Sequence, residues 1–166
     1  MGGRHPTNRS NEVTRVAQAL SGVRVLDLSR YISGPFCCQI LGDNGAEVIK
    51  VEKPTGEPGR AIPPLVENHS LYFMAYNGSK RGITLNFRST EGLALLRRLM
   101  GKADVVVENF RAGTMEKMGL GYDTLAEINP RLILVSISGF GTEGPYADRP
   151  AFDEIIQSMS GLASLT

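Results

Sequence analysis

The chain has 166 residues, a formal net charge of +1 at pH 7 and 42% hydrophobic residues. Because 18 Lys and Arg stand against 17 Asp and Glu, no sequence-wide basic surface is expected, and neither a nucleic-acid nor a membrane partner is predicted. The longest apolar runs, such as residues 132–137, are far shorter than the roughly 20 residues that cross a bilayer. The composition indicates a folded, soluble protein with a buried core.

The cysteines and the first residues bear on where the protein works. Cys37 and Cys38 are neighbours in the chain, and neighbouring side chains rarely meet disulfide geometry, so we expect a thiol-tolerant, cytoplasmic location. Residues 1–21 contain no apolar stretch of signal-peptide length and are interpreted as a flexible N-terminal arm. Since this arm holds three arginines and one acid, a targeting peptide for an organelle matrix stays open.

From Val23 onward, apolar segments alternate with loops and helical patterns. In chain order, the first half predicts a strand at 23–28, a helix at 36–43, a strand at 46–52, a Gly/Pro-rich loop at 53–64, an ambiguous segment at 70–76 and a strand at 82–87. Thr90 is expected to cap a helix at 91–102. The apolar face of that helix holds Leu93, Leu96, Leu99 and Met100.

The second half continues the alternation. It predicts a strand at 103–108, a short helix at 122–128, a strand at 132–138 and a helix at 151–165. Strands that are almost entirely apolar and are separated by helices indicate an α/β fold with a parallel sheet covered by helices on both faces. Ligands of such sheets bind beyond the carboxyl ends of the strands, here the loops after Leu28, Glu52, Phe87, Glu108 and Ser138.

One of these loops matches the G-x-G-x-x-G pattern through Gly139, Gly141 and Gly144. A dinucleotide site requires a helix that begins within the motif, so that its N-terminus meets the pyrophosphate. Pro145 follows the motif at once, and no further strand remains to supply a ribose-binding acid. A glycine-rich turn is therefore favoured over an NAD site.

Basic residues follow three of the predicted strands. Lys53 follows the second strand, Arg88 the third, and Arg111 and Lys117 the fourth. Each alone is typical of a solvated surface residue. Several cations at one edge of a sheet, however, would suit phosphate groups, because each supplies hydrogen-bond donors together with charge.

The acidic residues give weaker indications. Candidates for acid–base chemistry are Asp27, Glu52, Asp104, Glu108 and Asp153, and a structural or surface role is favoured for Asp27 and Asp104 because both lie within strand patterns. The two cysteines are expected to pack in the core as small hydrophobic side chains. No group of residues has the spacing of metal ligands, so no metal is expected.

Four segments, 22–60, 71–92, 103–146 and 152–166, together resemble the class III CoA-transferase family, also called CaiB/BaiF. The motifs that carry the resemblance are ENFRAG (108–113), INPRLI (128–133) and SISGFG (136–141). The resemblance implies that residues 22–166 form a Rossmann-like CoA-binding domain, the N-terminal part of a longer chain. It further implies an interlinked homodimer, with acyl-CoA and a carboxylic acid acceptor as substrates.

The resemblance also implies a mechanism. In this family an aspartate attacks the acyl-CoA thioester, and the reaction passes through a mixed anhydride and an enzyme thioester. That aspartate follows an SLTG-like segment by a few residues, whereas this sequence ends at Ser164, Leu165 and Thr166. We therefore expect the nucleophile beyond Thr166 and assign no catalytic residue within the chain.

Positions that line CoA can be carried over where the motifs match. They are Ile32, Ser33, Lys53, Leu85, Asn86, Arg88, Asn109, Phe110, Arg111, Lys117, Ser138, Gly139, Phe140 and Gly141. The chain departs from the family at Ile32, where Gln is frequent, at Arg88, where formyl-CoA transferases have Lys, and at Ala112, where Pro is common.

Two alternatives to a transferase stay open. Racemases that resemble α-methylacyl-CoA racemase have His immediately before the position of Asp153, but this chain has Phe152, so a two-base proton shuttle would lack a member. Transferase is favoured for this reason. The second alternative is a non-catalytic CoA-binding or dimerising module, suggested by the nucleophile that the sequence does not contain.

The C-terminal segment predicts how the isolated chain behaves. Large apolar side chains recur at near-helical spacing at Phe152, Ile155, Ile156, Met159 and Leu162. In the family such segments lie against the rest of the chain and the partner subunit. The 166-residue chain alone is therefore expected to associate or aggregate.

Overall fold

The computed structural model describes residues 18–165. Most of the arm predicted at 1–21 lies outside the described residues. The last four residues of that range form a turn, in which the Leu20 N–H donates to the Asn44 carbonyl at 2.9 Å. Leu20 packs against buried Val25 and its neighbours, so residues from Leu20 onward are part of the folded domain.

The centre of the molecule is a parallel sheet of five strands in the order β5-β2-β1-β6-β7. The strands are β1 (Arg24–Asp27), β2 (Glu47–Glu52), β5 (Lys80–Thr84), β6 (Val105–Glu108) and β7 (Ile133–Ser136). The chain moves outward from β1 through β2 to β5, then returns to the other side of β1 for β6 and β7. The strand order therefore reverses between β1 and β6, where open α/β sheets place their ligands.

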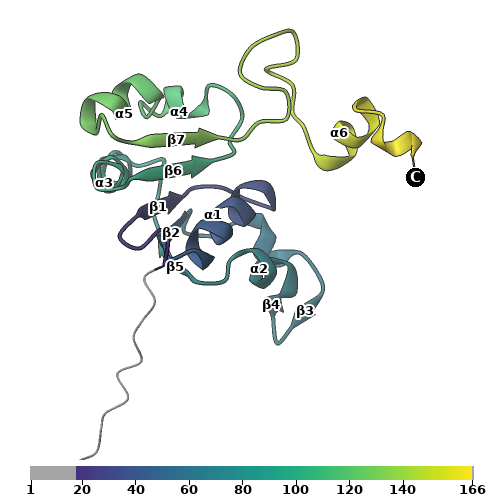
Figure 1. Ribbon diagram of the computed structural model, residues 1–166, viewed down its shortest axis with the longest axis horizontal. Coiled ribbons are helices and arrows are strands. Elements are labelled where there is room, and N and C mark those ends of the chain that lie inside the picture. The colour runs from purple at the N-terminus through teal and green to yellow at the C-terminus, as the bar shows by residue number, and fades with distance from the viewer. Residues whose placement is uncertain (1–17, 166) are drawn as a thin grey trace, which may run out of the picture.

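Helices cover both faces of this sheet, as the sequence predicts (Figure 1). One face holds α1 (Ser33–Asp43), whose Cys38 packs against Val25, Val48 and Val107. The other face holds α3 (Thr90–Met100), α4 (Thr114–Lys117) and α5 (Tyr122–Ile128). Their buried side chains there include Leu96, Met100, Met115 and Leu125. The Rossmann-like α/β fold is thereby confirmed.

Small elements connect β2 to β5. They are the 3-10 helix η1 (Pro58–Ala61), a hairpin of β3 (Leu65–Val66) and β4 (His69–Ser70), and α2 (Leu71–Tyr76). The segment that is ambiguous in the sequence is thus the end of β4 followed by a helix. Ser70 begins this helix, because its hydroxyl accepts a hydrogen bond from the Phe73 N–H at 3.1 Å.

Three expected boundaries are wrong. The strand expected at 82–87 is β5, which begins at Lys80 and ends at Thr84, because these residues pair with β2 from Val48 to Glu52. Ser89 rather than Thr90 caps α3, since its hydroxyl accepts from the Gly92 N–H at 3.0 Å. The first helix begins at Ser33, three residues early, because Pro35 fits a first helical turn.

The C-terminal segment lies beyond the carboxyl ends of the strands, on the side toward which the arrows of β6 and β7 point (Figure 1). It consists of α6 (Asp153–Met159) and a short 3-10 helix, η2 (Leu162–Ser164). The helix is shorter than the expected 151–165, because Gly161 adopts a left-handed conformation with φ of +81°.

Candidate functional site

The loops that follow β1 and β6 meet at the point where the strand order reverses. The Arg30 N–H donates to Asn109 Oδ1 at 2.8 Å, and Asn109 Nδ2 donates to the Arg30 carbonyl at 2.7 Å. Asn109 comes directly after β6, so one side chain closes the two loops against each other. This reciprocal pair brings the predicted site residues Asn109 and Phe110 beside the first loop.

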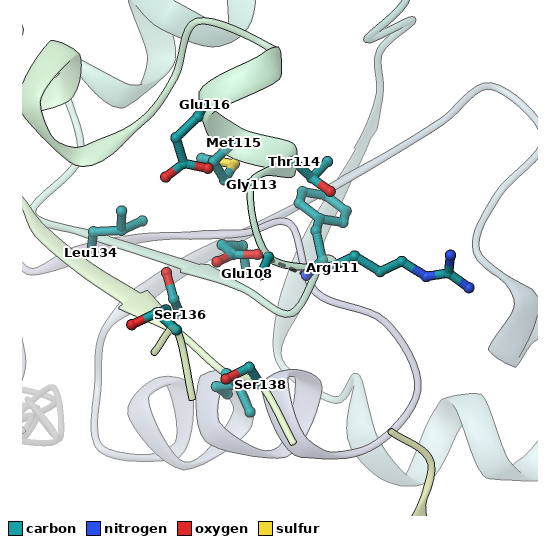
Figure 2. A pocket seen from close by; sticks show the side chains of 13 residues that line it. Glu108, Arg111, Gly113, Thr114, Met115, Glu116, Leu134, Ser136 and Ser138 are labelled. Atoms are coloured by element: carbon teal, nitrogen blue, oxygen red, sulfur yellow. Dashed lines mark hydrogen bonds between the residues drawn. The ribbon is translucent and has the colours of Figure 1, made fainter. Parts of the chain in front are cut away.

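A small pocket lies next to this junction, between the ends of β6 and β7 (Figure 2). It is partly open to solvent and offers about 50 Å³ to the centres of water-sized groups, so several water molecules would fit in it. Three of the predicted CoA-binding residues line it: Phe110, Arg111 and Ser138. The guanidinium of Arg111 extends away from Glu108 and Ser136 (Figure 2), which leaves it available at the rim.

Glu108 gives the pocket its one deeply buried carboxylate among the lining residues. Its side chain is buried, and Oε2 accepts a hydrogen bond from the Phe110 N–H at 2.7 Å. This bond links the Glu108 side chain at the end of β6 to the backbone of Phe110 in the following loop. Of the five acids considered from the sequence, Glu108 is the only one that lines this pocket.

The remaining predicted residues are spread along the same edge of the sheet. Ile32 and Ser33 are exposed at the start of α1, Lys53 is exposed after β2, and Lys117 is exposed as the last residue of α4. Asn86 and Arg88 lie in the exposed loop after β5, where Asn86 Oδ1 accepts from the Arg88 N–H at 3.0 Å. Leu85 is half-buried and packs against the core.

The glycine-rich loop after β7 does not open a helix, in agreement with the interpretation as a turn. Gly139 faces Ala151, and a Cβ on Gly139 would lie 2.1 Å from the Ala151 Cβ, so a side chain there would displace the start of α6. Gly141 has φ of +80°, a conformation that favours glycine. Phe140 packs against Tyr146 with ring centroids 5.6 Å apart.

Behind the first loop lies a buried cluster of four charged side chains: Asp27, Lys50, Glu57 and Lys80. Lys80 Nζ donates to Asp27 Oδ2 at 2.8 Å, to the Pro35 carbonyl at 2.8 Å and to Asn77 Oδ1 at 2.9 Å. Lys50 Nζ donates to the Ser29 carbonyl at 3.0 Å. The two lysines of the cluster thus bind backbone carbonyls of the first loop and of the first turn of α1.

The electrostatics of this cluster follow from burial and pairing. Burial alone would raise the pKa of Asp27, but the ammonium groups of Lys50 and Lys80, with hydrogen bonds from Lys80 and Ser29, bring it below its ordinary value. Burial lowers the pKa of Lys80, although Asp27 opposes this change. Burial raises the pKa of Glu57, which lies 3.9 Å from Lys50 Nζ. The structural role favoured for Asp27 is borne out by these contacts.

The other acids also have structural partners. Glu52 forms an ion pair with Arg60, whose guanidinium lies 3.9 Å from the Phe73 ring centroid. Asp104 Oδ2 accepts from the Arg24 N–H at 2.8 Å and joins the starts of β1 and β6. Cys38 is fully buried, as expected, whereas Cys37 is half-buried; burial raises the pKa of the Cys38 thiol well above its usual range.

Sequence reasoning missed Arg30, Lys50, Glu57 and Lys80. A signal existed for Lys50, because a charge within an apolar strand must find a buried partner. Arg30 also follows a strand end: it comes three residues after β1, as Arg88 comes four residues after β5. Within residues 18–165, no group of His, Cys, Asp and Glu could hold a metal ion, and no helix is long and apolar enough to cross a membrane.

A parallel sheet covered on both faces, with the loops after β1 and β6 paired where the strand order reverses, defines a Rossmann-like α/β fold. Residues 20–166 match CoA-transferase family III, and the chain belongs to that family.

Relatives and solved structures agree with this assignment. The chain is 48% identical over 155 residues to a succinate–glutarate CoA-transferase of Agrobacterium fabrum, and 42% identical over 154 residues to the beta subunit of a succinyl-CoA–L-malate CoA-transferase of Chloroflexus aurantiacus. These alignments cover 89% and 92% of this chain but only 39% and 38% of the relatives. A CaiB/BaiF family crystal structure from Brucella suis superposes with a TM-score of 0.86 at 47% identity, covering 91% of this chain and 41% of that one.

Proposed function

We propose that the protein containing this chain transfers CoA from an acyl-CoA thioester to a carboxylic acid, with a small dicarboxylic or hydroxy acid as acceptor. The observation that carries the proposal is the family match over residues 20–166. Its relatives named above act, by their names, on succinate, glutarate and malate, which all have two carboxylates. CoA and acyl-CoA are substrates in this proposal, and no metal takes part.

The described residues support a role in CoA binding. Lys53, Arg88 and Arg111 are exposed in loops after the carboxyl ends of strands, and Lys117 is exposed at the end of α4. None of the four forms an ion pair within the part of the chain that the structure describes. Cations without a protein partner can bind phosphate through charge-assisted hydrogen bonds. The other CoA-lining positions that the family resemblance implies remain predictions for the same site.

The chemistry proposed is that of the family. A carboxylate beyond Thr166 displaces the CoA thiolate from the acyl group and forms a mixed anhydride; the thiolate then attacks the aspartyl carbonyl, which gives an enzyme thioester and releases the donor acid. The acceptor acid repeats these two steps in reverse order. We further propose that the full-length protein is an interlinked homodimer in the cytoplasm, or in an organelle matrix if residues 1–21 are a targeting peptide.

The racemase alternative has an observation against it. Phe152 stands where those racemases have His, and its ring packs edge-on against Tyr31 with centroids 6.1 Å apart. The phenyl ring of Phe152 has no basic atom that could accept the α-proton of an acyl-CoA. The second alternative, a non-catalytic CoA-binding module, is separated from a transferase by whether the reading frame continues to an aspartate beyond Thr166.

The test uses the full-length protein. Incubation with succinyl-CoA and glutarate should give glutaryl-CoA, measured by liquid chromatography and mass spectrometry, and hydroxylamine added with the acyl-CoA should convert one aspartate to a hydroxamate. Exchange of deuterium at the acyl α-carbon without transfer would support the racemase instead. Binding of CoA without either reaction would support the binding module.

A further inference from the structure

Arg30 lies at the point between β1 and β6 where the strand order reverses, and open α/β sheets bind their ligands at this point. It follows the end of β1 by three residues, and its loop lies against the loop after β6, at the reversal of strand order. The residues carried over from the family do not include it. Its backbone N–H and carbonyl are both bound by the Asn109 amide, so the position of its Cα is fixed.

The guanidinium of Arg30 has an unusual environment. Its Cζ lies 5.4 Å from the centre of the Phe110 ring, and its Nε is buried with no hydrogen-bond partner among the described residues. Within residues 18–165 no carboxylate lies in ion-pair distance of it, whereas Arg24 and Arg60 pair with Glu47 and Glu52.

This arrangement favours an anion. A half-buried arginine loses part of its hydration, and an unpaired buried donor has an unfavourable free energy that an oxyanion would relieve. The planar fork of donors fits two oxygens of a carboxylate or a phosphate at once. The Arg30 guanidinium lies over the Phe110 ring in a cation–π contact, and no carboxylate among residues 18–165 forms an ion pair with it.

We propose that Arg30 binds an oxyanion of the acyl-CoA substrate, a proposal that rests on the function proposed above. The oxyanion is the free carboxylate of a dicarboxylic acyl group or a phosphate of CoA itself. Arg30 is thus a substrate-binding residue at the junction of β1 and β6, one loop away from Arg111 and the pocket beside it.

Residue-resolved chemical labelling of the wild-type, full-length protein provides the first test. Phenylglyoxal modifies accessible guanidinium groups, and peptide mass spectrometry reports the modification of Arg30. Protection by succinyl-CoA but not by CoA or acetyl-CoA would assign the acyl carboxylate, and protection by all three would assign a phosphate. Unchanged labelling of Arg30 at saturating concentrations of each ligand overturns the proposal.

Variants provide the second test. Arg30→Gln should weaken binding of the protecting ligand by about 10-fold to 100-fold in isothermal titration, as expected for loss of a charge-assisted pair. Arg30→Lys should keep part of that affinity, because the charge remains while the fork is lost. Arg131→Gln is the matched control, an exposed arginine just before β7 at the opposite edge of the sheet. Equal affinity of Arg30→Gln and wild type for all three ligands overturns the proposal.

CoA transfer by the wild-type protein is measured first, which separates the two proposals. If transfer is present and Arg30 is neither protected nor needed for binding, the proposed function stands and the role of Arg30 is wrong. If transfer is absent, the function itself is wrong, and the labelling still reports whether Arg30 meets the oxyanion of a bound ligand.

Discussion

Lys80 is the side chain on which the buried charge cluster depends. Its side chain is 2% exposed, and its ammonium donates to the fully buried Asp27 at 2.8 Å and also to the Pro35 carbonyl and to Asn77 Oδ1. Removing Lys80 would leave the buried Asp27 carboxylate with a more distant cation only, the Lys50 ammonium at 3.6 Å. The stability of the first loop is therefore expected to be sensitive to this single residue.

Lys80→Met should lower the free energy of unfolding by about 3–5 kcal/mol, because Asp27 would lose its closest cation. Urea unfolding followed by circular dichroism measures this change. Arg81→Met is the matched control on the same strand: Arg81 is 79% exposed and pairs with Glu47 at 3.2 Å, so its loss should change stability by less than about 1 kcal/mol. Similar losses for both variants would contradict the role given to the cluster.

Glu57 gives the cluster a dependence on pH. Its carboxyl is buried, its Oε1 has no hydrogen-bond partner among the described residues, and burial raises its pKa above the ordinary 4.5. Between the unfolded and the folded pKa the folded state holds an additional proton, so the free energy of unfolding falls as pH rises through this window and stays level above it. Asp27 has the opposite sign but acts below its ordinary value of 3.8.

Glu57→Gln should remove that slope. Thermal unfolding between pH 4 and pH 8 should show the wild type losing stability, relative to the variant, as pH rises through the window just above 4.5. Measurement at constant ionic strength keeps surface charges from contributing differently. Parallel curves for the two proteins would mean that Glu57 titrates at its ordinary value.

At the scale of elements, the amide of Asn109 joins two loops that are 79 residues apart in sequence. Asn109→Ala should raise the hydrogen–deuterium exchange of residues 29–33 and lower the free energy of unfolding by about 1–3 kcal/mol, since the Arg30 N–H would be left unsatisfied. Asn86→Ala is the control, because the Asn86 side chain bonds only within its own loop. Unchanged exchange at 29–33 would show that the two loops do not depend on this side chain.

The loop after β5 carries a separate prediction for CoA binding. Arg88 is exposed and has no ion pair in the described region, so Arg88→Ala should weaken CoA binding by about 10-fold or more in the full-length protein, with the loss shrinking at high salt. Isothermal titration at two salt concentrations measures this effect. Arg98→Ala, an exposed arginine in the last turn of α3, should bind CoA as the wild type does. Unchanged affinity of Arg88→Ala would return Arg88 to the solvated surface.

The elements that could be predicted from sequence are those whose burial is nearly complete. Residues 105–107 are three consecutive valines in β6, and three of the six residues of β2 are apolar; these two strands are the neighbours of the central strand. The pattern misplaces β5, because this edge strand is mostly exposed and begins with the charged pair Lys80 and Arg81. Hydrophobic periodicity reflects which side chains are buried. An edge strand buries few side chains, so its first and last residues cannot be predicted from this pattern.

The candidate site was predicted in part for a related reason. Cations after strand ends could be recognised one strand at a time, and Phe110, Arg111 and Ser138 do gather at one pocket. Lys80, Lys50 and Arg30 depend instead on which strands become neighbours. Lys80 contacts Asp27 because the sheet order places β5 beside β2 and β2 beside β1. The local hydrophobic pattern of each strand does not predict that order.

At the scale of the whole molecule, the C-terminal segment keeps the apolar surface expected from sequence. Phe152, Met159 and Leu162 are each at least half exposed. Leaving such side chains in water is unfavourable by about 1.5–3 kcal/mol each relative to burial. Phe152 precedes α6, Met159 ends it and Leu162 begins η2, and this segment lies beyond the carboxyl edge of the sheet (Figure 1).

The isolated 166-residue chain should therefore associate or aggregate in solution, and co-expression with the remainder of the full-length protein should suppress this behaviour. Size exclusion with light scattering measures the mass of the particle. Replacing Phe152, Met159 and Leu162 with Ser should shift the chain toward a monomer if these side chains drive association. A monodisperse species of 18.0 kDa for the unaltered chain would contradict the prediction.

The two outer strands of the sheet differ in what they offer to a further strand. β5 presents Arg81 and Gly82 at its exposed edge, while Lys80 on the same strand turns a charge inward, and both features discourage pairing with another chain. β7 consists of Ile133, Leu134, Val135 and Ser136 and has no charged residue. A further strand could therefore pair with β7 without meeting a charged residue of that strand. The charged residues of β5 disfavour such pairing at the opposite edge of the sheet.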